Sequence, residues 1–218
     1  MMKLYFGPGA CSFVPHAALE VIKATTGRDF EAQIVKLHKG EQKTPEFLSL
    51  NPLGLVPVLV VDGKPLTQIV AICDYLDRAC PQAGFLPTDT WERAQALSTL
   101  VWMNNTVHPT FTHVFRPAAF AESEAAQADV RQVAVGKFRE HMERIQAMLA
   151  HAAPWFNGAK PSFADFYALT FMRWGGFAGI DPAALPAYQA YVDRVAALPA
   201  VASAMAREGI KLDTYKPA

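Results

Sequence analysis

The sequence predicts an α/β domain followed by an all-helical domain. Strand-like and helix-like patterns alternate over roughly the first 80 residues, and strand-like alternation is missing beyond them. Between the two regions, the segment from Pro81 to Pro87 also contains Gly84, a composition typical of a connection. We therefore expect an α/β domain at residues 1–81, a linker at 82–88 and a helical domain at 89–218.

The composition is typical of a globular protein. Of the 218 residues, 51% are hydrophobic, and 20 basic side chains balance 20 acidic ones. Such a balance gives no long-range field to attract nucleic acid or an anionic membrane, so neither is expected as a partner. No apolar run approaches the roughly 18 residues of a membrane span, and no secretory signal is expected at the N-terminus. Three cysteines are too few for a disulfide framework, which favours a reducing, cytoplasmic location.

The first 37 residues predict a strand, a helix and a second strand. Residues 3–6 form a short apolar strand that ends at the turn Gly7-Pro8-Gly9. Apolar residues then recur at helical spacing until Gly27, with Pro15 in the first turn, where a helix accepts proline. Residues 30–37 alternate as a strand does, which completes a βαβ unit.

The rest of the first domain predicts two strands and a helix. A short helical turn at residues 45–50 leads to a buried strand at 58–61. Asp62-Gly63 is a strong hairpin signal, so residues 65–67 should return antiparallel. A helix follows over residues 69–79. The order βαβ, connector, ββα is that of the thioredoxin-like fold.

The second domain predicts helices that begin and end at recognisable residues. Ser162 and Asp165 have the spacing of a capping box, which we interpret as a structural feature. The expected helices cover approximately residues 91–115, 123–152, 162–175, 186–197 and 201–208.

Cys11 is the first candidate for chemistry. It precedes the first predicted helix, where unpaired N–H groups and the helix dipole stabilise an anion. We therefore expect a lowered pKa and a larger thiolate fraction. No second cysteine follows within three residues, so dithiol redox chemistry is not expected. The alternative is a small buried cysteine in a turn, without a functional role.

Two further features could bind an extended ligand. Val56-Pro57 begins a buried strand, and a cis bond there would turn the Val56 backbone outward to pair with a ligand. Gln68 and Ile69 begin a helix, whose N-terminus suits a carboxylate. An ordinary polar start to a helix explains the second feature equally well.

A polar cluster lies on the first helix of the second domain. Asn104, Asn105 and His108 are spaced to share one face, which indicates a cleft or an interface. The five-residue step to His113 does not place both rings on one side, so no metal site is expected. A purely structural histidine is the alternative.

Taken together, the motifs resemble those of the bacterial beta class of glutathione S-transferases. The strongest likeness lies in residues 3–12 (KLYFGPGACS) and 51–59 (NPLGLVPVL). The likeness extends over essentially the whole chain, through residues 107–117, 162–165, 172–174 and 207–210. The resemblance implies a thioredoxin-like domain followed by the all-helical C-terminal domain of these transferases.

The resemblance also implies glutathione as co-substrate, with no metal. The cysteinyl backbone of glutathione would pair with Val56 beside a cis Pro57, and its γ-glutamyl carboxylate would meet Gln68 and the backbone of Ile69. Six residues are implied to contact glutathione: Tyr5, Lys39, Val56, Pro57, Gln68 and Ile69. The departure from the class lies at Ile69, where a small or hydroxyl-bearing residue is usual. The lost hydrogen bond would weaken binding roughly 10- to 100-fold.

In the implied catalytic site, Cys11 lies beside the glutathione sulfur, where it could form a mixed disulfide, and His108 lies near the same sulfur. Phe111, Phe115 and Trp174 would form the apolar wall of the acceptor pocket. These transferases are usually homodimers, and the implied role is detoxification of small hydrophobic electrophiles. Three functions remain open: conjugation of glutathione, glutathione-dependent reduction of disulfides or peroxides through Cys11, and a non-catalytic binding or regulatory role.

Overall fold

A four-stranded sheet with the order β2-β1-β3-β4 forms the first domain in the computed structural model, which describes residues 1–152 and 154–217. β1 (Met2–Phe6) runs parallel to β2 (Phe30–Ile34) and antiparallel to β3 (Val58–Val61). β4 (Lys64–Thr67) returns antiparallel to β3 after the turn at Asp62-Gly63, as predicted.

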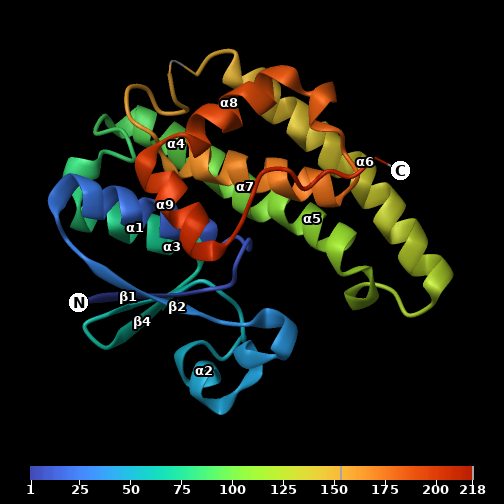
Figure 1. The fold of residues 1–218 in the computed structure, drawn as a ribbon, viewed down its shortest axis with the longest axis horizontal. Helices are drawn as coiled ribbons and strands as arrows, with labels where there is room; N and C mark the ends of the chain where they lie inside the picture. Colours follow the sequence, from blue (N-terminus) through green and yellow to red (C-terminus); the bar gives the residue numbers. More distant parts are fainter. Residues whose placement is uncertain (153, 218) are drawn as a thin grey trace.

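Two helices cover one face of this sheet and a short helix lies on the other (Figure 1). α1 (Phe13–Thr26) and α3 (Ile69–Ala79) pack on the face where alternate β1 residues are buried. α2 (Pro45–Leu50) lies against the opposite face and contributes Phe47 to a small apolar cluster there. The expected thioredoxin-like arrangement is confirmed.

The second strand is shorter than predicted. The alternation over residues 30–37 suggested a strand of that length, but β2 ends at Ile34. Val35 still donates a backbone hydrogen bond to Phe6 at 2.8 Å, whereas the N–H of Lys36 is bound by the Glu41 side chain at 2.7 Å. The Glu41 carboxylate thus replaces a strand partner, and the chain turns away from the sheet.

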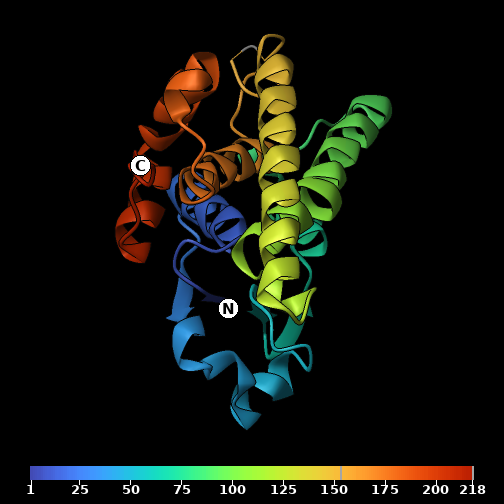
Figure 2. The same cartoon turned by 90° about the vertical axis from the view of Figure 1, so that its right-hand side faces the viewer.

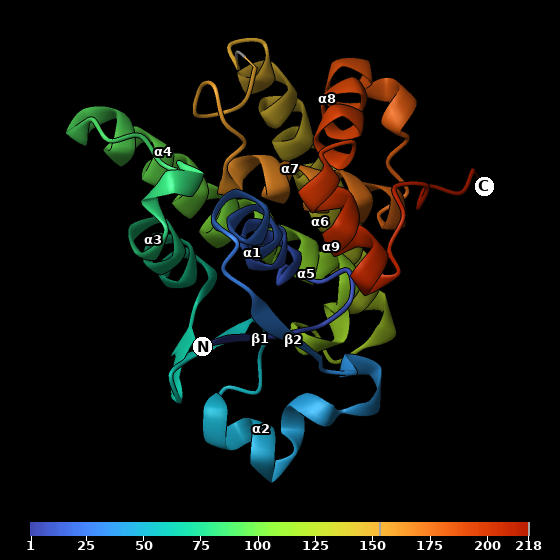
Figure 3. The ribbon, with the colours of Figure 1, turned by 60° about the vertical axis from the view of Figure 1, so that its left-hand side comes forward.

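The regular elements described in the second domain are helices, as predicted, apart from an isolated bridge between Trp155 and Gly158. Its helices are α4 (Thr90–Trp102), α5 (His108–Phe115), α6 (Glu124–Leu149), α7 (Phe163–Phe177), α8 (Pro186–Ala196) and α9 (Pro199–Glu208). Figure 2 shows the long α6 running beside α4 and α5. α7 is buried on nearly every side, and α1 of the first domain packs against α7 and α9 (Figure 3). In the described residues, no helix is long and apolar enough to cross a membrane.

The single helix predicted over residues 91–115 contains a wider π-helical turn at Met103–Val107. Pro109 follows this turn and has no N–H to donate to the preceding carbonyls. A π turn is a common way to accommodate such a defect without ending the helix, and such turns often occur at functional sites. Here it lies directly before His108.

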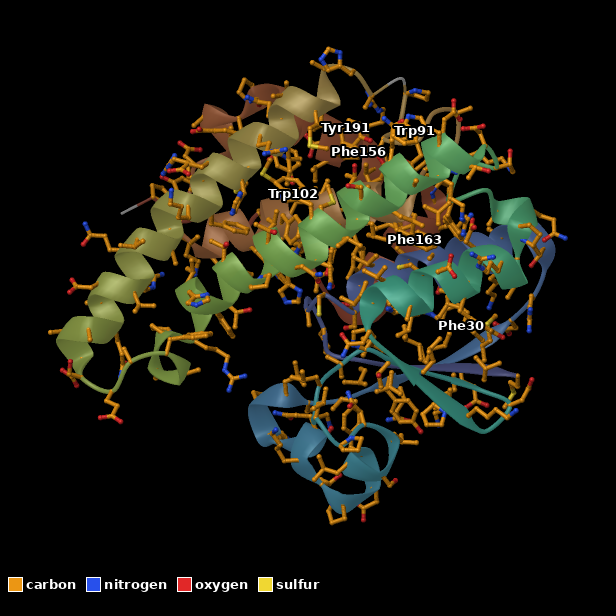
Figure 4. The ribbon with its side chains drawn as sticks, turned by 180° about the vertical axis from the view of Figure 1, so that it is seen from behind. Phe30, Trp91, Trp102, Phe156, Phe163 and Tyr191 are labelled. Carbon is orange, nitrogen blue, oxygen red and sulfur yellow. The ribbon has the colours of Figure 1, made fainter. Side chains whose placement is uncertain are left out.

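The predicted linker at residues 82–88 is packed into the core. Ala83, Phe85 and Leu86 are buried, and the Phe85 ring lies 4.5 Å from that of Phe163. Figure 4 shows Phe163 where the two domains meet. The hydrophobic core is therefore continuous between the domains, and the linker fixes their relative position.

The capping box at the start of α7 is present, as predicted. The backbone N–H of Ser162 donates to Asp165 at 2.6 Å, and the Tyr191 hydroxyl and the Phe156 N–H also donate to the same carboxylate. Figure 4 shows Tyr191 and Phe156 close together at this end of the domain. Burial raises the pKa of Asp165. The box therefore joins α8 to α7 in addition to capping a helix.

Candidate functional site

The loop between β1 and α1 is closed on itself by Ser12. The Ser12 hydroxyl accepts from the Gly7 N–H at 3.1 Å and lies 3.2 Å from the Gly7 carbonyl oxygen, to which it donates. The Ala10 N–H donates to the same carbonyl at 3.0 Å. These bonds hold Cys11 at the end of a tight loop, directly before α1.

The helical domain holds the same loop through Gly9. The Gly9 N–H donates to Glu208 of α9 at 2.8 Å, and Trp174 of α7 donates from Nε1 to the Gly9 carbonyl at 3.0 Å. Gly9 has a φ of 70°, and a Cβ at this position would lie 3.0 Å from the Arg173 guanidinium. The positive φ therefore favours glycine, and the close approach of Arg173 leaves little room for a side chain. Glu208 also pairs with the buried His16 at 2.7 Å.

The environment of Cys11 differs from the prediction. Its side chain is 8% exposed, and its Sγ lies 3.7 Å from the Val56 carbonyl oxygen, to which the thiol donates. Burial raises the pKa of Cys11 to about 12, although backbone hydrogen bonds at Cys11 and Ser12 act in the opposite direction. The predicted lowering of the pKa is therefore wrong. A helix end is worth at most about 2 kcal/mol, whereas full burial can shift a pKa by about 3–5 units, so burial dominates.

The Val56-Pro57 peptide bond is cis, as the resemblance implied. Asn51 supports the preceding loop, because its Nδ2 donates to the Leu55 carbonyl at 2.7 Å. Gly54 lies in this loop with a φ of 62°. The loop brings the Val56 backbone to the Cys11 thiol, so these two candidate residues lie together.

Gln68 and Ile69 begin α3, as predicted. Gln68 is exposed and has φ 69° and ψ 120°, a region that non-glycine residues rarely adopt. The first turn of α3 carries no acidic side chain. Ile69 is buried and its side chain belongs to the main core, so residue 69 can meet an anion through its backbone N–H and not through its side chain.

His108 lies in a polar contact that includes a residue the sequence did not indicate. The Tyr167 hydroxyl donates to Asn104 Oδ1 at 3.0 Å and lies 3.3 Å from His108 Nδ1. Asn104 Nδ2 donates to Asn105 Oδ1 at 2.7 Å. Burial lowers the pKa of His108 to about 4. His113 lies apart and stacks on Phe120 with a centroid distance of 3.8 Å.

The three aromatic residues predicted for the acceptor pocket form a stack. The ring of Phe111 lies 4.5 Å from that of Trp174 and 6.0 Å from that of Phe115, each at an interplanar angle of 14°. Phe115 at the outer end is 71% exposed. The inner end reaches His108, 5.0 Å from Trp174 between ring centroids. The stack therefore extends from the surface to the residues around Cys11.

Tyr5 borders this arrangement through Val56, whereas Lys39 lies in a separate turn. The Tyr5 ring packs edge-on against Phe47 of α2 at 6.1 Å, in the small cluster that also contains Val56. Lys39 is exposed in the short helical turn Leu37–Lys39. The structure thus joins Cys11 to Val56, joins His108 to the aromatic stack, and packs Tyr5 in the cluster that includes Val56. Lys39 remains exposed in its own turn.

Comparisons with known proteins point to one family. The family model described as "Glutathione S-transferase, N-terminal domain" matches residues 1–78, and that described as "Glutathione S-transferase, C-terminal domain" matches residues 103–199. A glutathione S-transferase of Xanthomonas campestris pv. campestris is 34% identical over 210 residues, which cover 96% of this chain and all of that protein. A maleylacetoacetate isomerase of Rhizobium meliloti is 36% identical over 146 residues, or 64% of this chain and 66% of that one.

Solved structures agree with this similarity. A sphingomonad glutathione S-transferase in complex with glutathione has a TM-score of 0.81 and 35% identity, covering 96% of this chain and 100% of that one. A bacterial beta-class glutathione S-transferase of Sphingomonas chungbukensis has a TM-score of 0.80 and 33% identity, with the same coverage.

Proposed function

The chain belongs to the glutathione S-transferase family of enzymes, and on that premise we propose that it conjugates glutathione to small hydrophobic electrophiles. The observation that carries the proposal is the convergence of three features: the Cys11 thiol, the Val56 backbone and the aromatic stack beginning at Trp174. The first two could hold a thiol peptide, and the third offers an apolar surface beside it.

In the proposed binding mode, glutathione pairs with the Val56 backbone beside Pro57. Its γ-glutamyl carboxylate meets the Ile69 N–H at the start of α3, where no acidic side chain competes, and Gln68 adds a side-chain donor. The resemblance also assigns Lys39 and Tyr5 to glutathione contacts. The related sphingomonad enzyme was solved with glutathione bound, which supports glutathione as the co-substrate.

In the proposed reaction, the glutathione thiol loses its proton to solvent and its sulfur attacks the electrophile. A carbon–sulfur bond forms while the leaving group departs with its bonding electrons. Cys11 remains protonated near neutral pH because its pKa is about 12, so when glutathione binds it can redirect its one hydrogen bond from the Val56 carbonyl to the glutathione thiolate. Such a bond favours the charged sulfur and lowers the pKa of glutathione. Phe115, the exposed end of the stack, would contact the electrophile, and the buried Phe111 and Trp174 would support Phe115 from behind.

The alternative of disulfide or peroxide reduction receives less support. Reduction by Cys11 requires its thiolate as nucleophile, and burial suppresses that form. Isomerisation is a second alternative, suggested by the Rhizobium relative. A non-catalytic binding role is the third, and it requires that glutathione conjugation be absent.

The test combines retention on immobilised glutathione with conjugation of 1-chloro-2,4-dinitrobenzene. We expect retention, conjugation, and substantial activity in Cys11→Ala, whereas Cys80→Ala, which removes another buried thiol, should match the unmodified chain. Disulfide reductase activity that disappears only in Cys11→Ala would establish reduction instead. Turnover of maleylacetoacetate without conjugation would establish isomerisation. Retention with no turnover of any of these substrates would leave a binding role.

We further propose that the chain forms a homodimer in the bacterial cytoplasm and serves detoxification. Light scattering at micromolar concentration should give twice the chain mass of 23.9 kDa. A monomer at all concentrations would refute the dimer without affecting the proposed reaction.

A further inference from the structure

We propose that Tyr167 and Asn104 are positioning residues that hold His108 in the neutral tautomer with its proton on Nδ1. In this form Nε2 is the ring's hydrogen-bond acceptor. The inference about the tautomer rests on local geometry. Its consequence for glutathione rests on the proposed function.

The first step is the orientation of the Asn104 amide. Asn104 Nδ2 donates to Asn105 Oδ1 at 2.7 Å, so Nδ2 is directed away from Tyr167. Oδ1 of the same amide lies 3.0 Å from the Tyr167 hydroxyl. An amide oxygen only accepts hydrogen bonds, so the hydroxyl must be the donor in this contact.

The second step follows from counting protons. Burial raises the pKa of Tyr167 well above its usual value, so the hydroxyl keeps its one proton. That proton is used in the bond to Asn104. Toward His108 Nδ1, at 3.3 Å, the hydroxyl oxygen can therefore only accept. Nδ1 must carry the proton, and the partner of one ring nitrogen sets the tautomer of the whole ring.

The third step concerns the charge of the ring. A doubly protonated imidazolium would also donate from Nδ1, but the described surroundings of His108 disfavour it. Its ring lies beside Trp174 and edge-on to Tyr167, at 5.0 and 6.4 Å between centroids. Burial lowers the pKa of His108 to about 4, so the ring is neutral at pH 7. A single proton on Nδ1 leaves Nε2 with a free lone pair.

The wide turn at Met103–Val107 places both partners of Tyr167. Asn104 lies within this turn and His108 directly follows it, and both side chains reach the same hydroxyl on α7. The π turn thus has a specific structural consequence, in line with the frequent occurrence of such turns at functional sites.

The consequence for the proposed reaction is a neutral acceptor beside the thiol site. The His108 ring lies 5.0 Å from that of Trp174, which is hydrogen-bonded to the loop that carries Cys11. An acceptor Nε2 can receive a hydrogen bond from the glutathione thiol and orient it. With a pKa of about 4, the ring would not store the proton at neutral pH.

The tautomer can be measured by long-range ¹H–¹⁵N correlation NMR of the chain labelled with ¹⁵N-histidine. The six histidines give separate patterns, and the pattern missing in His108→Gln identifies His108. We expect the Nδ1–H tautomer in the unmodified chain and a shift toward Nε2–H in Tyr167→Phe. Tyr188→Phe is the matched control, because it removes another buried hydroxyl, which donates to the Ala168 carbonyl at 2.8 Å.

Two spectroscopic results would overturn the proposal. One is an Nε2–H tautomer in the unmodified chain, which would mean that the Asn104 amide has the opposite orientation. The other is an unchanged His108 pattern in Tyr167→Phe, or an equal change in Tyr188→Phe.

Conjugation kinetics provide the second readout. Tyr167→Phe should raise the KM for glutathione roughly tenfold and leave kcat nearly unchanged, because the bound thiol loses about one neutral hydrogen bond, with a smaller effect in Tyr188→Phe. If the unmodified chain shows the Nδ1–H tautomer but no conjugation, the proposed function fails and the tautomer assignment stands. If conjugation occurs with the Nε2–H tautomer, the assignment fails alone.

Discussion

Alkylation of Cys11 by iodoacetamide should be far slower than that of an ordinary thiol. The thiolate is the reactive form, and burial raises the pKa of Cys11 from 9.0 to about 12. At any pH below 9, this difference reduces the thiolate fraction about a thousandfold. The side chain is also only 8% exposed, which slows the reagent further. The combined effect is a reduction of the labelling rate by about a thousandfold or more.

The assay follows labelling by mass spectrometry over a range of pH, with peptide mapping to separate the three cysteines. The rate at Cys11 should keep rising about tenfold per pH unit through pH 9, where an ordinary thiol begins to level off. In denaturant, Cys11, Cys73 and Cys80 should react alike, which provides the internal standard. A Cys11 rate that levels off near neutral pH would refute the reasoning, because it would mean that the helix end outweighs burial.

Three further predictions concern other residues of the site. Trp174→Phe removes the bond to the Gly9 carbonyl and should lower the free energy of unfolding by about 1–3 kcal/mol in urea titrations. Burial lowers the pKa of His108 from 6.5 to about 4, so the folded chain resists protonation of this ring more than the unfolded chain does. The free energy of unfolding should therefore fall by about 3 kcal/mol as the pH decreases from 6.5 to 4. In a pH series, His108→Gln should lack this loss. Ile69→Ser should reduce the free energy of unfolding by about 3 kcal/mol, because the side chain lies in the main core, and by calorimetry it should leave the glutathione affinity within about twofold.

Each of these predictions has a clear contrary result. The control for Trp174→Phe is Trp91→Phe. Because Trp91 is 71% exposed, this variant should change the free energy of unfolding by less than about 0.5 kcal/mol. Equal losses in the two tryptophan variants would argue against a role for the Gly9 bond. Parallel acid titrations of the unmodified chain and His108→Gln would contradict the pKa assigned to His108. Markedly tighter glutathione binding in Ile69→Ser would mean that the residue 69 side chain reaches the ligand and not the core.

Much of the fold follows from local signals in the sequence. Asp62-Gly63 specifies the hairpin, Gly27 ends α1, and the capping box begins α7. These features could be predicted because each depends on residues only a few positions apart. The packed linker could not, because Pro81 and Gly84 indicate a connection regardless of what covers it. The burial of that segment depends on contacts with α7.

Part of the site was equally inaccessible to sequence patterns. Glu208 binds the N–H of Gly9 across 199 residues, and Tyr167 approaches His108 from another helix. No spacing rule relates residues that far apart. The burial of Cys11 has the same origin, and it reverses the expectation drawn from the helix end alone.

Two long-range contacts hold the loop in which the buried Cys11 thiol remains protonated. The loop around Cys11 is held by Glu208 of α9 and Trp174 of α7, and both bonds are made to the backbone of Gly9. Loss of either bond should expose the loop to water, weaken the effect of burial and lower the pKa of Cys11 toward its ordinary range. Trp174→Phe should therefore accelerate the alkylation of Cys11 while it reduces stability. If stability falls without faster alkylation, the second domain holds the loop but does not control the reactivity of the thiol.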